Sequence, residues 1–189
     1  MRAHLVFLDE SGFLLTPTVH RTWAPRGQTP ILDSAGHWTK ISASSAIVVS
    51  PNRKRLSLYS RFHKDKNIGS AETAGFLRQL SKRLRGPVVI VWDNGNQHKG
   101  SAVADFMETH PDWFFHRFPG YAPELNPDEF VWALLKRSVA NSTPRDNDEL
   151  KRLLHRPLMR LRQSQKLLWS CIRASELPWR RVLCQRVAQ

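Results

Sequence analysis

The sequence predicts an α/β domain, because short buried strands combine with amphipathic helices along one chain. Two apolar runs, Leu5 to Leu8 and Val88 to Trp92, each end abruptly in an aspartate, as expected of strands buried on both faces of a sheet. Two further segments, Ile41 to Val49 and Leu56 to Phe62, are rich in Ile, Val, Tyr and Phe, which favour strands. Later segments show apolar residues at helical spacing. A sheet covered by helices follows from these patterns.

The strands of the first half are expected in a definite order. The first leaves the sheet at Asp9-Glu10-Ser11-Gly12, and the second and third are joined by a hairpin at Ser50-Pro51-Asn52-Arg53. A helix over Ser70 to Leu84 stops before Gly86-Pro87 and leads into the strand that ends at Asp93. Turn residues, Asn94-Gly95-Asn96, follow that aspartate.

The second half is predicted to be mainly helical. A helix over Ser101 to Thr109 precedes a short strand over Trp113 to Phe118 and a loop rich in Gly and Pro. Asn126 is a good N-cap and Pro127 a good first residue for the next helix, which places Glu129 in its first turn. After a break at Asn141 to Pro144, basic helical segments run from Asp148 to the end.

Length and composition indicate one domain. The 189 residues are enough to bury one sizeable core, so we expect residues 1–143 to form the main body and residues 144–189 a basic helical extension of it. The two cysteines, Cys171 and Cys184, lack the paired spacing of a zinc site and are expected to be free thiols. No apolar run suits a signal peptide or a membrane span, which predicts a cytoplasmic protein.

The charge balance points to a polyanionic partner. Lys and Arg number 29 against 16 Asp and Glu, giving a formal net charge of +13. Such an excess supplies the sequence-independent part of nucleic-acid binding, although ribosomal and membrane-surface proteins share it. Nucleic acid is therefore one of several partners that the charge alone allows.

Three acidic residues form the candidate catalytic set: Asp9 and Asp93 at strand ends and Glu129 at a helix start. Carboxylates that converge repel one another, so such a cluster is stable mainly with divalent cations. Oxygen ligands favour Mg²⁺ or Mn²⁺, and two such ions can promote in-line cleavage of a phosphodiester. Each residue also has a simpler interpretation, because the aspartates can be turn residues and Glu129 can complete an Asn-x-x-Glu capping box.

Four motifs resemble the bacterial insertion-sequence branch of the mariner transposase superfamily, of the insertion sequence six-thirty type. They are Phe7-Leu8-Asp9-Glu10-Ser11-Gly12, Trp23-Ala24-Pro25-Arg26-Gly27-Gln28-Thr29-Pro30, Trp92-Asp93-Asn94-Gly95-Asn96-Gln97-His98 and Tyr121-Ala122-Pro123-Glu124-Leu125-Asn126-Pro127-Asp128-Glu129. The resemblance implies a ribonuclease H-like fold, with a mixed central sheet flanked by helices, and a DDE triad of Asp9, Asp93 and Glu129. It also implies two Mg²⁺ or Mn²⁺ ions bound by that triad.

The same resemblance implies a function and partners. Such enzymes cut transposon ends and direct the freed 3′ hydroxyl at target DNA, typically at a TA dinucleotide, and they generally act as dimers. A nucleoid-associated enzyme is therefore expected, acting as a homodimer or paired with the product of an upstream reading frame. The family's N-terminal helix-turn-helix domain is expected to be absent, because Asp9 lies so near the start of the chain.

Two acidic neighbours of the triad are assigned other roles. Asp128 precedes Glu129, but the family pattern Asn-Pro-x-Glu selects Glu129 as the ligand. Glu10 follows Asp9, and strand alternation is expected to direct it to the opposite face of the sheet.

Further residues are candidates for supporting roles. His98, Asn94 and Asn126 are expected to surround the metal site, where His98 would orient a phosphate or a water, or lie exposed at a helix start. Trp23 and the Arg26-Gly27 turn are expected either to contact DNA or to pack their loop against the sheet, and packing is favoured. Trp132 and Trp169 are expected to serve the core. Candidate DNA-binding residues are Arg26, Arg53, Lys54, Arg55, Lys136 and Arg137.

Three functions remain open from the sequence. The first is an active DNA transposase catalytic domain, for which the intact triad is the main support. The second is an inactive truncated fragment that binds DNA or regulates a full-length transposase. The third is another ribonuclease H-like nuclease acting on RNA in hybrids, against which the Tyr-x-Pro-x-Leu-Asn-Pro-x-Glu motif argues.

Overall fold

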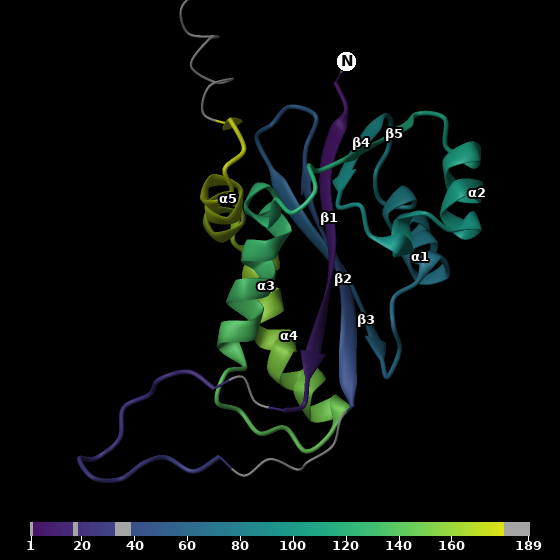
Figure 1. Ribbon diagram of the computed structural model, residues 1–189. Coiled ribbons are helices and arrows are strands. Elements are labelled where there is room, and N and C mark those ends of the chain that lie inside the picture. The colour runs from purple at the N-terminus through teal and green to yellow at the C-terminus, as the bar shows by residue number, and fades with distance from the viewer. Residues whose placement is uncertain (1, 17–18, 33–38, 180–189) are drawn as a thin grey trace, which may run out of the picture.

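A computed structural model describes residues 2–16, 19–32 and 39–179 of the chain. These residues form a central five-stranded sheet with helices on both faces (Figure 1). The elements in chain order are β1 (His4–Leu14), β2 (Lys40–Val49), β3 (Leu56–Lys64), α1 (Ser70–Ser81), β4 (Val88–Trp92), η1 (Asn96–His98), α2 (Ser101–Thr109), β5 (Trp113–Arg117), η2 (Pro123–Leu125), α3 (Pro127–Ser138), α4 (Asn147–Gln163) and α5 (Gln165–Ala174).

The sheet is mixed, as predicted. Its strand order is β3-β2-β1-β4-β5, in which β1 pairs antiparallel with β2 and parallel with β4. The second hairpin strand, β3, continues the antiparallel half, and β5 continues the parallel half beside β4. Strand β1 therefore lies at the junction of the two halves, with a neighbour on each side.

The prediction that the first strand leaves the sheet at Asp9 is wrong. Strand β1 pairs with β2 without interruption from Leu5↔Val49 to Leu14↔Lys40. On its other side, β1 is paired with β4 only from His4↔Val88 to Phe7↔Val91. The apolar run ends because β1 loses one neighbour there, while the hydrogen bonds to β2 keep its backbone extended.

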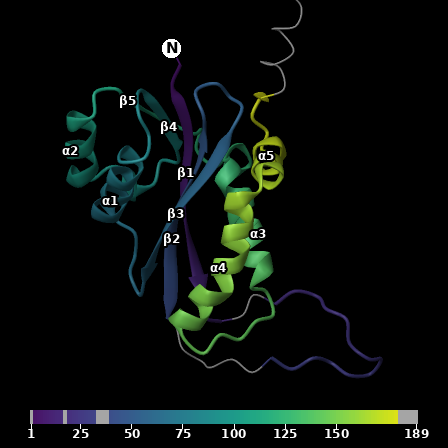
Figure 2. The same cartoon turned by 180° about the vertical axis from the view of Figure 1, so that it is seen from behind.

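Two hydrophobic layers cover the two faces of the sheet. Helices α3, α4 and α5 lie on one face, and α1 and α2 lie on the other (Figures 1 and 2). Alternation along β1 serves both layers, since Phe7 packs with the first group and Leu8 with the second. Buried residues of α4 and α5, such as Leu154 and Ile172, belong to the same cluster as Phe7. The basic helices after residue 146 are thus packed onto the sheet.

Helix boundaries follow local signals. Asn126 caps α3 by accepting a hydrogen bond from the backbone N–H of Asp128, with Pro127 as the first helical residue, as predicted. Helix α1 ends at Ser81, three residues before the predicted Leu84, although Leu84 itself remains buried. Cys171 is a free, buried thiol whose pKa burial raises to about 11, whereas Cys184 lies outside the described residues.

The connection between β1 and β2 extends away from the sheet in its described part (Figure 1). It turns at Gly27, whose φ of +84° is the left-handed region that favours glycine. The side chain of Trp23 is fully exposed, so the prediction that it packs against the sheet is wrong. No helix in the described ranges is long and apolar enough to cross a membrane.

Adjacent leucines on α4 test whether this helix belongs to the core. Leu154 has no exposed surface, whereas Leu153 is 39% exposed. We expect Leu154→Ala to lower the free energy of unfolding by about 2–5 kcal/mol because it leaves a cavity. Leu153→Ala is the matched control and should cost less than about 1 kcal/mol, since surface substitutions are mild. Urea denaturation measures both, and equal effects would contradict the packing of α4 on the sheet.

A carboxylate at the start of α1 makes stability depend on pH. Glu72 accepts a hydrogen bond from the backbone N–H of Gly69 at 3.0 Å and pairs with Lys66. Hydrogen bonding to Lys66 lowers the pKa of Glu72 from 4.5 to about 2. Its contribution is therefore complete above pH 4.5 and lost as the pH falls toward 2.

Glu72→Gln should accordingly destabilise the protein by on the order of 1 kcal/mol near neutral pH and by less in acid. The measurement is urea denaturation of both proteins at neutral pH and at a pH between those two pKa values. Glu108→Gln, at an exposed position on α2, is the control. A loss of stability that is the same at both pH values would refute the role of the Glu72 charge.

Candidate functional site

The three acidic residues singled out in the sequence line one cleft of about 390 Å³. Asp9 comes from β1, Asp93 from the end of β4 and Glu129 from the first turn of α3. The other lining residues are Asn94, Gly95, Asn126 and every residue from Phe118 to Pro123. None of the described residues that line this cleft is a Lys, Arg or His. The site therefore gathers negative charge without a basic side chain on its walls.

The two aspartates meet because their strands are parallel neighbours. Phe7 pairs with Val91, so the same register continued two residues further brings Asp9 level with Asp93. Asp93 directly follows Trp92, the last residue of β4. Asp9 is not at a strand end, so its alternative interpretation as a turn residue does not hold.

Glu129 is held at the cleft by the start of α3. Its backbone N–H donates to the carbonyl oxygen of Asn126 at 3.2 Å, while the N–H of Asn126 donates to Pro123 at 2.9 Å. Because that second N–H is occupied, the Asn-x-x-Glu capping box does not form. Glu129 is exposed, and its carboxylate is free to act in the cleft.

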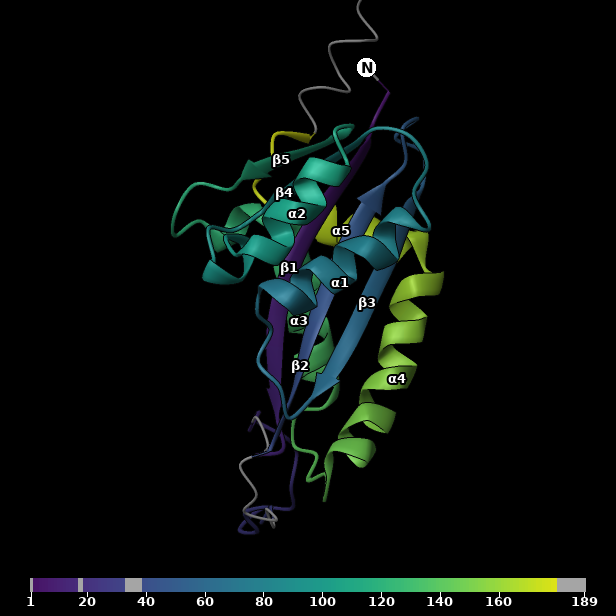
Figure 3. The same cartoon turned by 90° about the vertical axis from the view of Figure 1, so that its right-hand side faces the viewer.

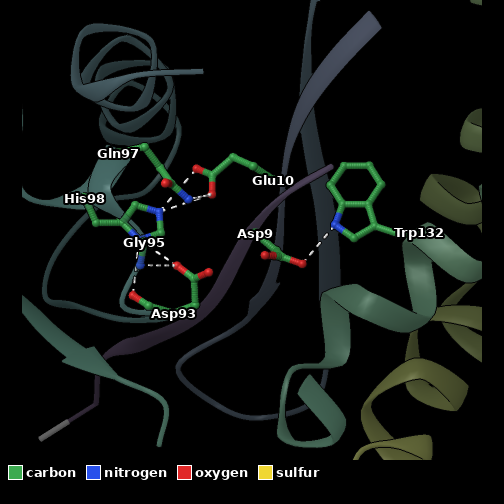
Figure 4. A network of polar contacts seen from close by, with 7 residues as sticks. All are labelled: Asp9, Glu10, Asp93, Gly95, Gln97, His98 and Trp132. Carbon is green, nitrogen blue, oxygen red and sulfur yellow. Dashed lines mark hydrogen bonds and ion pairs between the residues drawn. The ribbon is translucent and has the colours of Figure 1, made fainter. Parts of the chain in front are cut away.

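Asp9 is buried and is held by a tryptophan of α3. The indole Nε1–H of Trp132 donates to Asp9 Oδ2 at 3.0 Å (Figure 4). Burial, together with the charges of Glu129, Glu10 and Asp93, raises the pKa of Asp9 from 3.8 to about 8. Trp132 does serve the core, as predicted, but it also contacts a triad residue.

Asp93 is held from the other side by His98. The Nδ1 atom of His98 lies 3.0 Å from Asp93 Oδ1, and the N–H of Gly95 donates to the same oxygen at 2.8 Å. The His98 ring is buried and stacks on Trp92, with ring centroids 4.2 Å apart. The hydrogen bond with His98 lowers the pKa of Asp93.

Glu10 completes this second network. The Nε2 atom of His98 lies 3.1 Å from Glu10 Oε2, and Gln97 Nε2 donates to that oxygen at 3.1 Å (Figure 4). Burial lowers the pKa of His98, but the hydrogen bonds with Asp93 and Glu10 outweigh it and raise this pKa to about 9. His98 is thus an imidazolium near neutral pH that bridges two carboxylates. It is too deeply buried to lie exposed at a helix start or to contact a phosphate directly.

Asp128 occupies the interior beside the cleft. It has no exposed surface, and its Oδ1 accepts a hydrogen bond from Ser45 Oγ of β2 at 3.0 Å. Burial and the nearby charge of Asp9 raise the pKa of Asp128 well above its ordinary value. Asp128 does not line the cleft, whereas Glu129 does.

The remaining sequence candidates divide by position. Asn94 and Asn126 line the cleft, but none of the six basic candidates does. Arg26 lies in the β1–β2 connection, and Arg53 donates to the carbonyl oxygen of Ala3 at 2.9 Å, just before β1. Lys54 and Arg55 share its hairpin, while Lys136 and Arg137 lie near the end of α3.

The contacts of Glu10 with His98 and of Trp132 with Asp9 were not predicted from the sequence. Both could have been suspected from spacing alone. Trp132 follows Glu129 by one helical turn, so the two share a face of α3. Glu10 alternates with Asp9 along a strand, which directs it toward the helices on the other face.

A divalent cation fits the chemistry of the cleft. Its charged donors are carboxylate oxygens only, which suit Mg²⁺ or Mn²⁺. Within the described ranges, no three His, Cys, Asp or Glu side chains are already grouped as ligands of one ion. Mg²⁺ usually needs only one or two protein carboxylates, with waters and phosphates completing its shell. Asp9, Asp93 and Glu129 supply such pairs.

The bond from Trp132 to Asp9 predicts an effect on metal affinity. Trp132→Phe keeps an aromatic ring in the core but removes the N–H that orients Asp9. We expect Mn²⁺ affinity to fall by about 10–100-fold, as for other residues that orient metal ligands. Isothermal titration with Mn²⁺ measures this, and thermal denaturation checks that the variant is folded.

The control is Trp169→Phe, on α5, whose partly buried ring packs against the same core without contacting the triad. Unchanged affinity in a folded Trp132→Phe would show that the hydrogen bond does not position Asp9. An equal loss in both variants would instead indicate a general effect on packing.

Solved transposase structures have the same fold. The chain aligns with the Mos1 mariner paired-end complex with Mn at a TM-score of 0.68 and 18% identity, covering 96% of this chain and 55% of that one. For the Mos1 strand transfer complex the TM-score is 0.67 and the identity 20%, covering 96% and 54%. For the isolated Mos1 catalytic domain these values are 0.61 and 16%, covering 96% and 81%. The predicted ribonuclease H-like fold is confirmed.

The chain spans about half the length of the transposase chains in those complexes. No curated protein has a sequence significantly similar to it. The family model described as DDE superfamily endonuclease matches residues 4–151, which include all three acidic residues of the cleft. By this match, the protein belongs to the DDE superfamily of endonucleases.

Proposed function

We propose that this chain is the catalytic domain of a DNA transposase, which cleaves DNA strands and transfers them by phosphodiester transesterification. Asp9, Asp93 and Glu129 are its catalytic, metal-binding residues. The observation that carries the proposal is their convergence in one cleft that has no basic side chain among its described lining residues. Such a site needs cations for charge balance, and DNA backbones bring further negative charge to them.

Two Mg²⁺ or Mn²⁺ ions, when bound, would activate an attacking oxygen and stabilise the leaving oxygen. The residues of the chain have separate tasks around them. Trp132 occupies one oxygen of Asp9 and leaves the other toward the cleft. His98 contacts one oxygen of Asp93 in the same way, while Glu129 is an exposed residue of the cleft lining. Asn94 and Asn126 add neutral polar groups to the lining, which suit bound water or phosphate oxygen.

The chemistry proceeds by two in-line displacements at phosphorus. In cleavage, a water oxygen bonds to phosphorus as the bond from phosphorus to the 3′ oxygen breaks, and the leaving 3′ oxygen takes up a proton. In strand transfer, that 3′ hydroxyl loses its proton and attacks a target phosphodiester, whose own 3′ oxygen leaves. Transfer conserves the number of phosphodiester bonds, so it requires no nucleotide cofactor.

The structural neighbours support DNA as substrate and partner. The Mos1 complexes hold paired transposon ends, one of them with Mn, and another is a strand transfer complex. The net charge of +13 suits the same polyanion. Both transposon ends and target DNA are therefore proposed substrates.

Finer assignments follow from the sequence motifs. We assign the chain to the insertion-sequence branch of the mariner superfamily, acting on nucleoid DNA as a homodimer or with an upstream-frame product. Residues 1–143 then form the catalytic body and residues from 144 onward its extension, in keeping with the shared core of α4, α5 and the sheet; residues 180–189 of this extension lie outside the described residues. The intact cleft and the family match favour this catalytic role over a non-catalytic regulatory fragment.

Plasmid nicking tests the proposal. We expect the wild-type chain to nick supercoiled plasmid with Mn²⁺ or Mg²⁺, and Asp93→Asn and Glu129→Gln to reduce nicking to the level without protein. Chelation of the metal should have the same effect. The matched control is Glu124→Gln, which removes an exposed carboxylate near Glu129 that does not line the cleft.

The same assay should be run with the chain fused to the product of the upstream frame. Nicking that survives Asp93→Asn would mean that the cleft is not the catalytic site. No nicking by either folded protein, with either metal, would overturn the catalytic assignment and leave a DNA-binding role.

A further inference from the structure

Helices α4 and α5 carry a run of basic residues that no acidic residue interrupts. Between Glu149 and Glu176 the sequence contains seven Lys and Arg and no Asp or Glu. One of them, Arg162, is partly buried and donates to Ser60 Oγ at 2.8 Å. The other six are exposed: Lys151, Arg152, Arg156, Arg160, Lys166 and Arg173. Among the described residues, no ion pair includes any of these six.

Part of this basic surface borders a groove. Helices α3, α4 and α5 border an open cavity of about 1000 Å³. Arg156 and Arg160 line it from α4, with further polar groups from Ser138, Gln163 and Ser164. Its apolar floor consists of Leu134, Pro157, Met159, Leu161 and Leu167. The two arginines are four residues apart, so they lie on one face of α4, about 6 Å apart along its axis.

The groove and the catalytic cleft share helix α3. Glu129 stands in the first turn of α3, and Leu134 and Ser138 follow on the same helix. The rise of an α-helix places Ser138 about 14 Å along the axis from Glu129. All three helices of the groove cover the same face of the sheet, and α4 lies toward the edge formed by β3 (Figure 3). A duplex that leaves the cleft along α3 would thus reach Arg156 and Arg160.

We propose that this groove binds the phosphate backbone of duplex DNA and extends the substrate path beyond the cleft. The inference rests on the proposed function of the cleft. Guanidinium groups bind phosphates through paired hydrogen bonds, and Ser and Gln side chains are further donors to phosphate oxygens. DNA sequence is recognised by hydrogen bonds to base edges, and contacts to phosphates do not involve these edges. Binding in the groove is therefore expected to be independent of DNA sequence. Arg156 and Arg160, which have no carboxylate partner among the described residues, supply the charge complementarity.

The test is binding of a fluorescently labelled duplex of arbitrary sequence, followed by anisotropy over a range of salt concentrations. The variant is Arg156→Gln/Arg160→Gln. The control is Lys82→Gln/Arg83→Gln, which removes the same charge from two exposed residues after α1, on the opposite face of the sheet. Thermal denaturation establishes that both variants are folded.

Each lost phosphate contact should reduce the slope of log K against log salt by about 0.9. The groove variant should therefore lose about 1.8 from this slope and bind more weakly, while the control keeps the wild-type slope. Equal behaviour of groove variant and wild type would overturn the proposal, as would equal losses in both variants. Binding of labelled polyglutamate, but not of DNA, that is lost in the groove variant and kept in the control would assign the groove to an acidic protein instead.

The binding assay is run with a chelator, so it needs no catalysis. If the groove variant binds DNA as tightly as the wild type, while Asp93→Asn abolishes nicking, only the proposal of a DNA-binding groove is rejected. If the groove variant binds DNA more weakly, as expected, but the wild-type protein never nicks DNA, the catalytic function is rejected and the proposal of a DNA-binding groove is kept.

Discussion

Strand β1 carries two adjacent carboxylates, Asp9 and Glu10, that are largely removed from solvent, and the arrangement of the site depends on the hydrogen-bond partner that each one finds. Because side chains alternate along a strand, Asp9 and Glu10 point to opposite faces of the sheet. A buried carboxylate without a partner is costly, so each face must supply one. Trp132 donates a neutral N–H to Asp9 on the α3 side, and the His98 imidazolium pairs with Glu10 on the α1 side.

These two solutions have different consequences. The neutral indole orients Asp9 without bringing a positive charge to the cleft, so it does not compete with a cation for the carboxylate. The charged imidazole of His98 instead pairs with both Glu10 and Asp93. Glu10, the neighbour of Asp9 on β1, thereby helps to hold Asp93 in place through His98. Stacking on Trp92 keeps this cation buried beside β4. The proposed metal site is thus supported from both faces of the sheet.

The start of α3 repeats the same division on a helix. Asp128 and Glu129 are adjacent, but successive helical residues point about 100° apart. Asp128 points inward to Ser45 of β2, where burial raises its pKa, and Glu129 points into the cleft. Each acidic pair therefore sends one carboxylate to the cleft and one to the interior. Basic residues lie elsewhere, on the outer faces of the helices and loops, where they can hold a polyanion without neutralising the cleft.

Much of this organisation could be predicted from the sequence. Apolar runs and capping residues located strands β1 to β4 and the start of α3, because those signals act between near neighbours in the chain. The four motifs then indicated the order Asp9, Asp93, Glu129 and the ribonuclease H-like fold. The prediction that the first strand ends at Asp9 was wrong, since the pairing of Asp9 with β2 depends on residues more than thirty positions away in the chain.

The sequence by itself determined most of the strands and helices and the charge, because these follow from residue type and local spacing, and its resemblance to a known family predicted which three carboxylates form the site. Only the tertiary structure decided that Trp132 contacts Asp9, that His98 bridges Glu10 and Asp93, and that Trp23 remains exposed. It also decided that Arg156 and Arg160 border a groove rather than a plain solvated surface. Such contacts join residues distant in the chain, and their partners are chosen by the packing of helices against the sheet.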